Sequence, residues 1–401
     1  MWIATLRRTL LTSGVGVLLA GCTGPAYYWQ SVSGHLQMLN AAKPVDEWLS
    51  DTSASASLKT RLALSQRIRS FAVSELSLPD NPSYRRYADL RRSAVVWNVV
   101  AAPELSLKLK TWCFPVTGCV GYRGYFDEGE ARAEAAKLKA DGFETAVYGV
   151  PAYSTLGWMN WAGGDPLLNT FINYPEGELA RLLFHELAHQ VVFASGDTTF
   201  NESFATAVER LGGQRWLDTH ASPEARQAYA QFNGRRQQFR ALAQRTRQEL
   251  RQIYAEQDRD RPGDEATDSA KEIAPRPVSA EQKAERLALK TAALEKFRRE
   301  YETLKNNWGG FAGYDPWVLQ ANNASFGVQA AYDELVPGFE ALFVQQGRDW
   351  PRFYDAVKQL AKLTKAERHR ALKALASSAP PPPAAQTHTT NNPLLQETPH
   401  G

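Results

Sequence analysis

Two histidines and a glutamate near the middle of the chain have the residue types and the spacing of a hydrolytic metal site. His185, Glu186 and His189 form the pattern His-Glu-x-x-His. On a helix, residues four apart lie one turn apart on the same face, so both imidazoles can reach one ion. Glu186 projects from the neighbouring position, where its carboxylate can take a proton from a metal-bound water without being a ligand itself.

The residues around this pattern predict a buried helix. Glu176 and Glu178 suit its first turn, and Gly196 can end it. Apolar residues surround it on almost every side, at Leu179, Leu182, Leu183, Phe184, Leu187, Val191, Val192 and Phe193. Two imidazoles and a carboxylate inside such a helix are costly unless a partner such as a zinc ion pairs with them. The alternative is a chance match that binds no metal.

A third ligand must come from another segment. Val192 and Ser195 stand where the longer metzincin pattern needs Gly and His, so that arrangement is excluded. Further on, residues 201–205 read Asn-Glu-x-x-Ala. His-Glu-x-x-His followed by Asn-Glu-x-x-Ala on a second helix resembles the gluzincin metallopeptidases, which include thermolysin and the large zinc aminopeptidases. By that resemblance Glu202 is the third zinc ligand, and a water completes the tetrahedron.

Glu202 also has an alternative role in the sequence. Thr199 and Glu202 fit a capping box, in which the glutamate side chain would fold back on the start of its own helix. Asp197 is then a further, weaker candidate ligand. Both interpretations stay open at this point, because each uses the same residue types at the same spacing.

The resemblance to gluzincins has two departures. The spacing from His189 to Glu202 is short for that group. Thr206 occupies the place where thermolysin-like enzymes have an Asp that orients a histidine. Glu209 lies on the same face of the predicted helix and could take over that role only if the helix curves.

The N-terminus has the features of an exported lipoprotein. A charged start at Arg7 and Arg8 precedes an apolar run at 10–19 that is too short for a membrane span. Leu19-Ala20-Gly21-Cys22 resembles the lipobox of bacterial lipoproteins. The resemblance implies that 1–21 is a signal peptide and that Cys22 carries a lipid. It also implies a periplasm-facing membrane, with the outer membrane favoured because no Asp follows Cys22. An ordinary signal peptide with a free Cys22 is the alternative.

The remaining cysteines, Cys113 and Cys119, are close together in a chain expected to be exported. Such an even pair suggests a disulfide, with two unpaired buried thiols as the alternative. The formal net charge is only +3 and falls by two once Arg7 and Arg8 are removed. We therefore expect no nucleic-acid partner.

Hydrophobic periodicity predicts an α+β fold that is predominantly helical. The helix that contains His185 and His189 is called the metal helix. The helices expected before it cover 36–49 with an interruption at Pro44, 58–76, 84–90 and 128–139. The expected strands cover 94–101, 105–112, 120–126 and 143–150. A small mixed sheet should therefore precede the metal helix, in a gluzincin-like core at 22–220. Residues 151–158 are a candidate wall of its cleft.

After the core, two helical patterns predict an antiparallel hairpin inserted at 221–307, with a mobile linker at 258–279. One arm is basic, which usually indicates a solvated face, with binding to anionic lipid or cell wall as the alternative. Residues 308–376 should complete the core, and 377–401 form a disordered tail. Tyr332 lies on a helix that begins near Asn322. The gluzincin resemblance makes it a possible oxyanion donor, and a core or surface role is the alternative.

Residues 113–126, 153–158 and 201–209, together with the metal helix, resemble a family of bacterial lipoproteins described as zinc aminopeptidases. The resemblance covers about 22–375 and implies zinc-dependent hydrolysis of peptide bonds. The segment Gly-x-Met-Glu-Asn, which reads the free amine in large aminopeptidases, does not occur, so cleavage at the N-terminus rests on the family description alone. The alternatives are a lipid-anchored binding or scaffold protein without catalysis, and an enzyme acting on cell-wall peptides.

Overall fold

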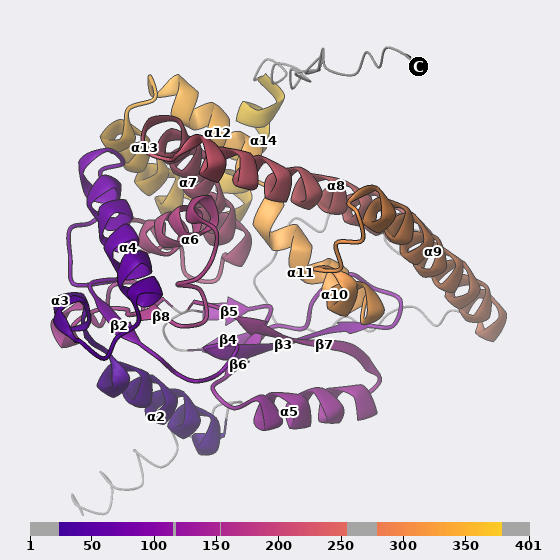
Figure 1. Cartoon of the computed structure of the whole chain (residues 1–401). Coiled ribbons are helices and arrows are strands. Elements are labelled where there is room, and N and C mark those ends of the chain that lie inside the picture. The colour runs from indigo at the N-terminus through magenta and orange to yellow at the C-terminus, as the bar shows by residue number, and fades with distance from the viewer. Residues whose placement is uncertain (1–23, 115–117, 153, 255–278, 379–401) are drawn as a thin grey trace, which may run out of the picture.

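The computed structural model describes residues 24–114, 118–152, 154–254 and 279–378 of the chain (Figure 1). The predicted signal peptide, the lipid on Cys22 and the predicted linker therefore lie outside the described residues, apart from position 279. The predicted tail does so from residue 379 on. Within the described part, helices predominate and the sheets are small.

A three-stranded antiparallel sheet lies on one side of the metal helix. β3 (Val96–Pro103) is its central strand, between β6 (Arg123–Tyr125) and β7 (Phe143–Val150). One face is covered by α5 (Glu128–Ala140) and the other by α11 (Asn323–Asp333). The predicted boundaries of the strand at 143–150 agree with those of β7, and those of α5 differ by one residue.

β3 is buried along nearly its whole length because a helix packs on each of its faces. Side chains alternate between the two faces of a strand. Trp97, Val99 and Ala101 pack against α5, whereas Val100 and Ala102 pack on the side of α11. This explains why the segment reads as a continuous apolar run instead of an alternating pattern.

A second small sheet corrects the helix predicted at 84–90, which is wrong. Residues 86–88 form a strand, and Tyr84 before it and Arg91 after it have φ of 65° and 52°. This left-handed conformation interrupts an α-helix at both ends of the segment. The sheet consists of β1 (Lys43–Pro44), β2 (Arg86–Ala88) and β8 (Leu167–Leu168).

Two further strand predictions are wrong in part. Residues 105–112 form no strand apart from the last of them, and Leu105 and Leu107 pack instead against the cluster of the α8–α9 helices. The strand expected at 120–126 is divided between β6 and β5 (Gly118–Val120), which pairs with β4 (Trp112–Phe114). Cys113 and Cys119 are opposite each other in this hairpin and are joined by a disulfide.

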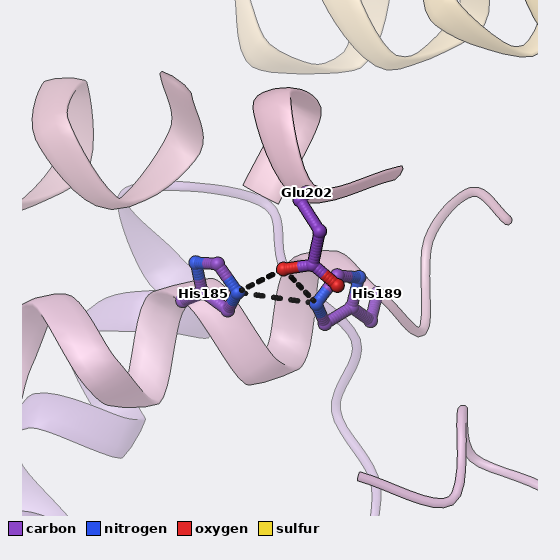
Figure 2. Close-up of side chains that lie close together, drawn as sticks. All are labelled: His185, His189 and Glu202. Carbon is purple, nitrogen blue, oxygen red and sulfur yellow. Dashed lines mark hydrogen bonds and ion pairs between the residues drawn. The ribbon is translucent and has the colours of Figure 1, made fainter. Parts of the chain in front are cut away.

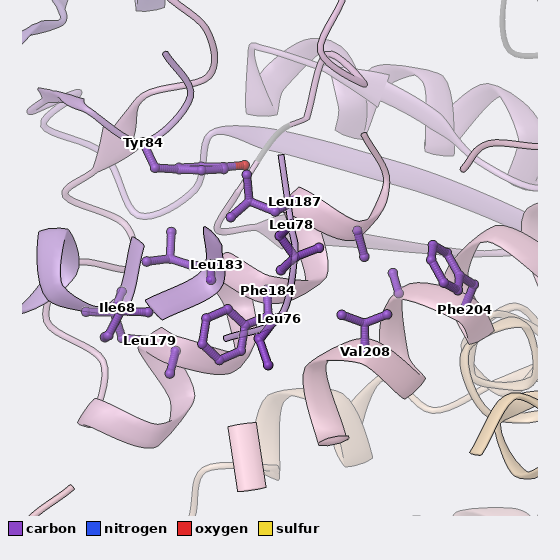
Figure 3. Close-up of a cluster of buried hydrophobic side chains, with 14 of the residues drawn as sticks. Ile68, Leu76, Leu78, Tyr84, Leu179, Leu183, Phe184, Leu187, Phe204 and Val208 are labelled. Atoms are coloured by element: carbon purple, nitrogen blue, oxygen red, sulfur yellow. The ribbon is translucent and has the colours of Figure 1, made fainter. Parts of the chain in front are cut away.

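The main hydrophobic core lies among the helices around α6 (Figure 3). Leu179, Leu183, Phe184 and Leu187 of α6 point into it. The helix α7 comes very close to α6 at Gly213. This residue has no side chain, and the side chain of Arg181 fills the space that a Cβ would need. The helices of this layer are α4 (Ala56–Ser74), α6 (Glu176–Ala188), α7 (Thr198–Thr219), α12 (Val336–Gln345), α13 (Trp350–Lys362) and α14 (Lys365–Ser378).

Two long helices, α8 (Pro223–Tyr254) and α9 (Ala280–Asn307), lie side by side in Figure 1. Arg245 pairs with Glu300 and Glu249 pairs with Lys296, so the numbering rises along one helix as it falls along the other. The pair is therefore antiparallel. An aromatic seam joins it to α10 (Asp315–Leu319) and α11.

The described part of the chain begins with α2 (Pro25–Ala41) and α3 (Val45–Ser50), which are separated near Pro44 as predicted. A short 3-10 helix, η1 (Asn160–Ala162), lies in the loop before β8. Among the helices in the described ranges, none is both long enough and apolar enough to cross a membrane.

Candidate metal centre

The imidazoles of His185 and His189 and the carboxylate of Glu202 converge on one point (Figure 2). The two Nε2 atoms are 3.1 Å apart, and Glu202 Oε2 lies 3.3 Å and 3.8 Å from Nε2 of His185 and of His189. Ligand atoms around a tetrahedral ion at ~2.0–2.1 Å are separated by roughly 3.3 Å. The spacing of the three atoms therefore suits a single metal ion.

The metal helix is shorter than predicted, but the spacing of its histidines is kept. α6 ends at Ala188, not near Gly196, and His189 is its C-cap with φ −58° and ψ −23°. These are helical angles, so His189 still lies one turn beyond His185. Its backbone N–H donates to the carbonyl of His185 at 3.3 Å.

A short loop between α6 and α7 explains the short spacing between His189 and Glu202. The amide of Asn201 closes this loop on itself, since its oxygen accepts from the N–H of Ala194 at 2.8 Å and its nitrogen donates to the same residue's carbonyl at 2.9 Å. The loop therefore turns the chain back directly, and α7 carries Glu202 over the end of α6.

The structure contradicts the capping-box interpretation of Glu202. Asp197 is the N-cap of α7, where its carboxylate accepts from the N–H of Phe200 at 3.2 Å. Glu202 is thus well inside the helix, with its carboxylate at the histidines. Asp197 is not a member of the cluster, because it bonds to His369 Nε2 at 3.0 Å instead.

Glu209 holds His185 in place from the side away from the cluster. Its Oε2 lies 3.0 Å from Nδ1 of His185, and its other oxygen accepts from Arg181. With a proton on Nδ1, the lone pair of Nε2 points towards the metal position. Burial raises the pKa of Glu209, but the charge of Arg181 and the contact with His185 together outweigh it and bring the pKa to about 2. Glu209 thus takes the role that Thr206 cannot fill.

Burial also sets the charge of the neighbouring groups. It lowers the pKa of His189 to about 4, whereas the carboxylates of Glu202 and Glu209 outweigh burial at His185 and raise the pKa of that imidazole. Burial raises the pKa of Glu186 to about 7, although His185 opposes the change. A carboxylate with a pKa near neutrality is well matched to general-base catalysis.

A chain of ion pairs connects the site to α8. Arg236 of α8 donates to Glu178 of α6 at 2.6 Å, and Glu178 lies 3.5 Å from Arg181. Arg181 in turn bonds to Glu209 and thereby acts on His185. Arg181 could not be identified from the sequence, since an arginine in the apolar first turns of a helix has no local pattern that marks it.

A cavity of about 720 Å³ opens beside the cluster. Glu186, Asn98 of β3 and Arg236 and Arg240 of α8 contribute to its lining. The cleft wall predicted at 151–158 is confirmed in part, because Pro151, Ala152, Ser154 and Leu156 line the cavity, whereas the other described residues of this segment do not. The cavity thus joins the metal helix, the sheet and the long helix pair in one site.

A family model described as "Putative aminopeptidase" matches residues 26–372, which is most of the chain. The chain belongs to this family. Membership implies a peptidase with a peptide substrate. No curated protein and no solved structure matches the chain.

In this aminopeptidase-family chain, a buried tyrosine of the sheet lies beside Asn98, which lines the cavity. Tyr148 of β7 is opposite Asn98 in the sheet register, and its hydroxyl lies 3.5 Å from the amide nitrogen of that residue. Burial raises its pKa to about 12, and the charge of Glu202 contributes to the rise. Tyr148 therefore remains protonated and able to donate. Tyr332 lies on α11, but its side chain is outside the described part of the structure.

Proposed function

We propose that the protein is a zinc-dependent hydrolase of peptide bonds. The observation that carries the proposal is the convergence of His185, His189 and Glu202 within 4.8 Å of one another, beside a cavity large enough for a peptide. Two imidazoles and one carboxylate are a donor set that zinc accepts in catalytic sites with an open position. When bound there, zinc supplies Lewis acidity that activates water and polarises the scissile carbonyl.

The residues of the chain then have distinct tasks. Glu186 accepts the proton of the attacking water and passes it to the leaving amine, because it is buried beside the cluster without belonging to it. Glu209 keeps His185 in the required tautomer. The hydroxyl of Tyr148 is a candidate donor to the developing oxyanion, alongside the sequence-based candidate Tyr332.

The position of the long helix pair favours this proposal over a non-catalytic scaffold protein, in which the hairpin would project away from the core. Arg236 and Arg240 of α8 line the cavity, and Arg236 is paired with α6. The hairpin is thus part of the cleft wall. We also propose that a lipid on Cys22 anchors the enzyme to a periplasm-facing bacterial membrane, which the lipobox-like Leu19–Cys22 segment supports.

The variant Glu186→Gln tests the catalytic assignment. It keeps the shape of the side chain but removes the base, so cleavage of a peptide library should fall by roughly 10²–10⁴-fold while zinc content stays at one ion per chain. Glu302→Gln makes the same chemical change on an exposed face of α9 and should leave cleavage unchanged. Undiminished cleavage by Glu186→Gln would reject the assignment.

Labelling with a fatty acid tests the anchor separately. The wild-type chain should incorporate the label in a bacterial host, and Cys22→Ser should not. Equal labelling of both chains would remove Cys22 as the lipid site without affecting the metal site.

A further inference from the structure

The helix α2 carries an apolar face that the rest of the described structure leaves uncovered. Trp29, Val32 and Leu36 are exposed by 75%, 55% and 48%. Their spacing of three and four residues places them on one side of the helix. No Asp, Glu, Lys or Arg occurs between Cys22 and Ala42. A helix surface in water normally carries charge opposite its buried face, and this one does not.

The other side of α2 fixes the orientation of the helix. Gly34 is in close contact with the ring of Phe126, so close that a Cβ would overlap it. Gln30 bonds to the same segment, since its Oε1 accepts from the N–H of Phe126 at 3.0 Å. Met38 is buried in the main core. The exposed face is therefore held outward by packing and is not the result of a fraying end.

A second exposed apolar segment lies beside the end of α2. Trp158 and Trp161, around η1, are exposed by 67% and 83%. Arg86 connects the two segments, because its guanidinium donates to the carbonyl of Ala162 at 3.4 Å and to that of Leu39 in α2 at 3.3 Å. The loop of η1 and the last turn of α2 are thus neighbours.

The two segments hold a disproportionate share of the exposed large hydrophobic side chains. Five of the eleven in the described ranges lie here, and a sixth, Tyr28, lies on α2 and also lines the cavity. The other five occur on separate elements, at Tyr174, Leu289, Leu319, Val344 and Leu363. Single exposed apolar residues are ordinary, whereas a group of this kind marks a binding surface.

We infer that α2 and the η1 loop form a surface that rests on a lipid bilayer. Tryptophan and tyrosine with aliphatic neighbours are the residues that enter the boundary between headgroups and acyl chains. The absence of charge on α2 removes the main cost of such contact. The position agrees, since Pro25 is three residues from Cys22 and the connecting chain spans at most about 10 Å.

This surface is distinct from the anchor and has its own consequence. A lipid alone holds the protein to the membrane at one point, whereas two contacts also define its orientation. The loop that holds Trp158 also supplies Ser154 and Leu156 to the cavity. One wall of the cavity is thereby braced against the membrane.

Two valines of nearly equal exposure provide a matched test in the lipidated full chain. Val32 of α2 and Val344 of α12 are exposed by 55% and 57%, and α12 lies on the opposite side of the molecule in Figure 1. Each is changed to Cys in a separate chain and labelled with an environment-sensitive dye. In phosphatidylcholine vesicles, the emission at 32 should shift to the blue, and that at 344 should stay as in water. Equal responses, or none at 32, would overturn the inference.

A second test removes the anchor. The chain that begins at Thr23 retains every described element, and it should still co-sediment with neutral phosphatidylcholine vesicles. The triple variant Trp29→Ser, Val32→Ser, Leu36→Ser should bind at least tenfold more weakly. The control triple variant Leu319→Ser, Val344→Ser, Leu363→Ser should bind as the parent does.

Three outcomes of this second test would refute the bilayer contact. They are no sedimentation of the parent, equal loss in both triple variants, and a parent dimer in ultracentrifugation that the α2 variant abolishes. The last would identify a second copy of the chain as the partner. Peptidase activity in solution should be the same in the parent and the α2 variant, so the result is independent of the proposed catalytic function.

Discussion

The ion pairs that join α6 to α7 and those that join α8 to α9 lie in opposite environments. In the first pair the side chains of Arg181, His185 and Glu209 are only 5%, 13% and 15% exposed, and they contact one another. In the second pair the side chains of Arg245 and Lys296 are 64% and 53% exposed. Buried charges are costly unless each has a partner, whereas exposed ion pairs contribute little either way.

The two pairs of helices are therefore stabilised by different interactions. The seam between α8 and α9 is aromatic, with Phe239, Phe297 and Tyr301 buried in it, so hydrophobic contact stabilises that pair. Between α6 and α7, polar groups replace part of that contact and orient His185, a candidate metal ligand. We expect changes in the first pair to act on metal binding and activity, and changes on the outside of the second pair to act on neither.

The largest expected effect is the loss of a metal ligand. His189→Ala removes one of the three donors, so the purified variant should contain almost no zinc. Its peptidase activity should fall by more than the roughly 10–100-fold that is typical for residues behind a ligand. The measurement is metal analysis together with a peptide assay. A variant with full zinc content and activity would show that the His185–His189–Glu202 cluster is not the centre.

The next effect concerns the residue behind the ligand. Arg181→Met leaves Glu209 buried without its cation, so the free energy of unfolding should decrease by roughly 3–5 kcal/mol. Zinc affinity should weaken by roughly 10–100-fold, because His185 loses its fixed orientation. The matched change Arg245→Met on α8 removes an exposed pair and should cost less than about 1 kcal/mol, with zinc affinity unchanged. Equal effects of the two variants in denaturant titration would contradict the comparison.

The smallest expected effect concerns the N-caps of α7 and α9, one helix from each pair. α7 has the charged N-cap Asp197, whereas α9 has a neutral capping box of Ser279 and Gln282. Burial raises the pKa of Asp197, but the hydrogen bond and charge of His369, with Lys365 nearby, outweigh it and lower the pKa below its usual value. A carboxyl group whose pKa is lowered in the folded state stabilises the fold at any pH above its unfolded-state pKa of about 4. This stabilisation is lost as the pH falls through the folded-state pKa.

We therefore expect Asp197→Asn to cost roughly 1–3 kcal/mol at pH 7, and the difference from wild type to shrink below about pH 4. Ser279→Ala should cost about 1 kcal/mol at every pH, because no charge is involved. Thermal unfolding of both variants from pH 7 to pH 3 measures this. A cost of Asp197→Asn that does not change with pH would show that its charge plays no part.

Several elements could be predicted from the sequence because one short segment contains the complete pattern that specifies each of them. The apolar run of β7 and the charged, capped pattern of α5 are examples. It failed at 84–90, where residues with helical spacing form a strand between β1 and β8. The backbone there pairs with segments that are far apart in the chain, and the N–H of Tyr84 donates to Asp165. Such pairing has no trace in the local periodicity.

The sequence by itself determined that His185 and His189 face the same way, because four residues are close to one helical turn. It also determined that the helix carrying them must be buried, through its apolar surroundings. Only the tertiary structure decided that Glu202 meets them, that Glu209, 24 positions from His185, supports one of them, and that Arg236 reaches Glu178 across 58 positions. The reason is physical: a helical turn is set by neighbouring residues, whereas contacts between helices depend on how their surfaces pack.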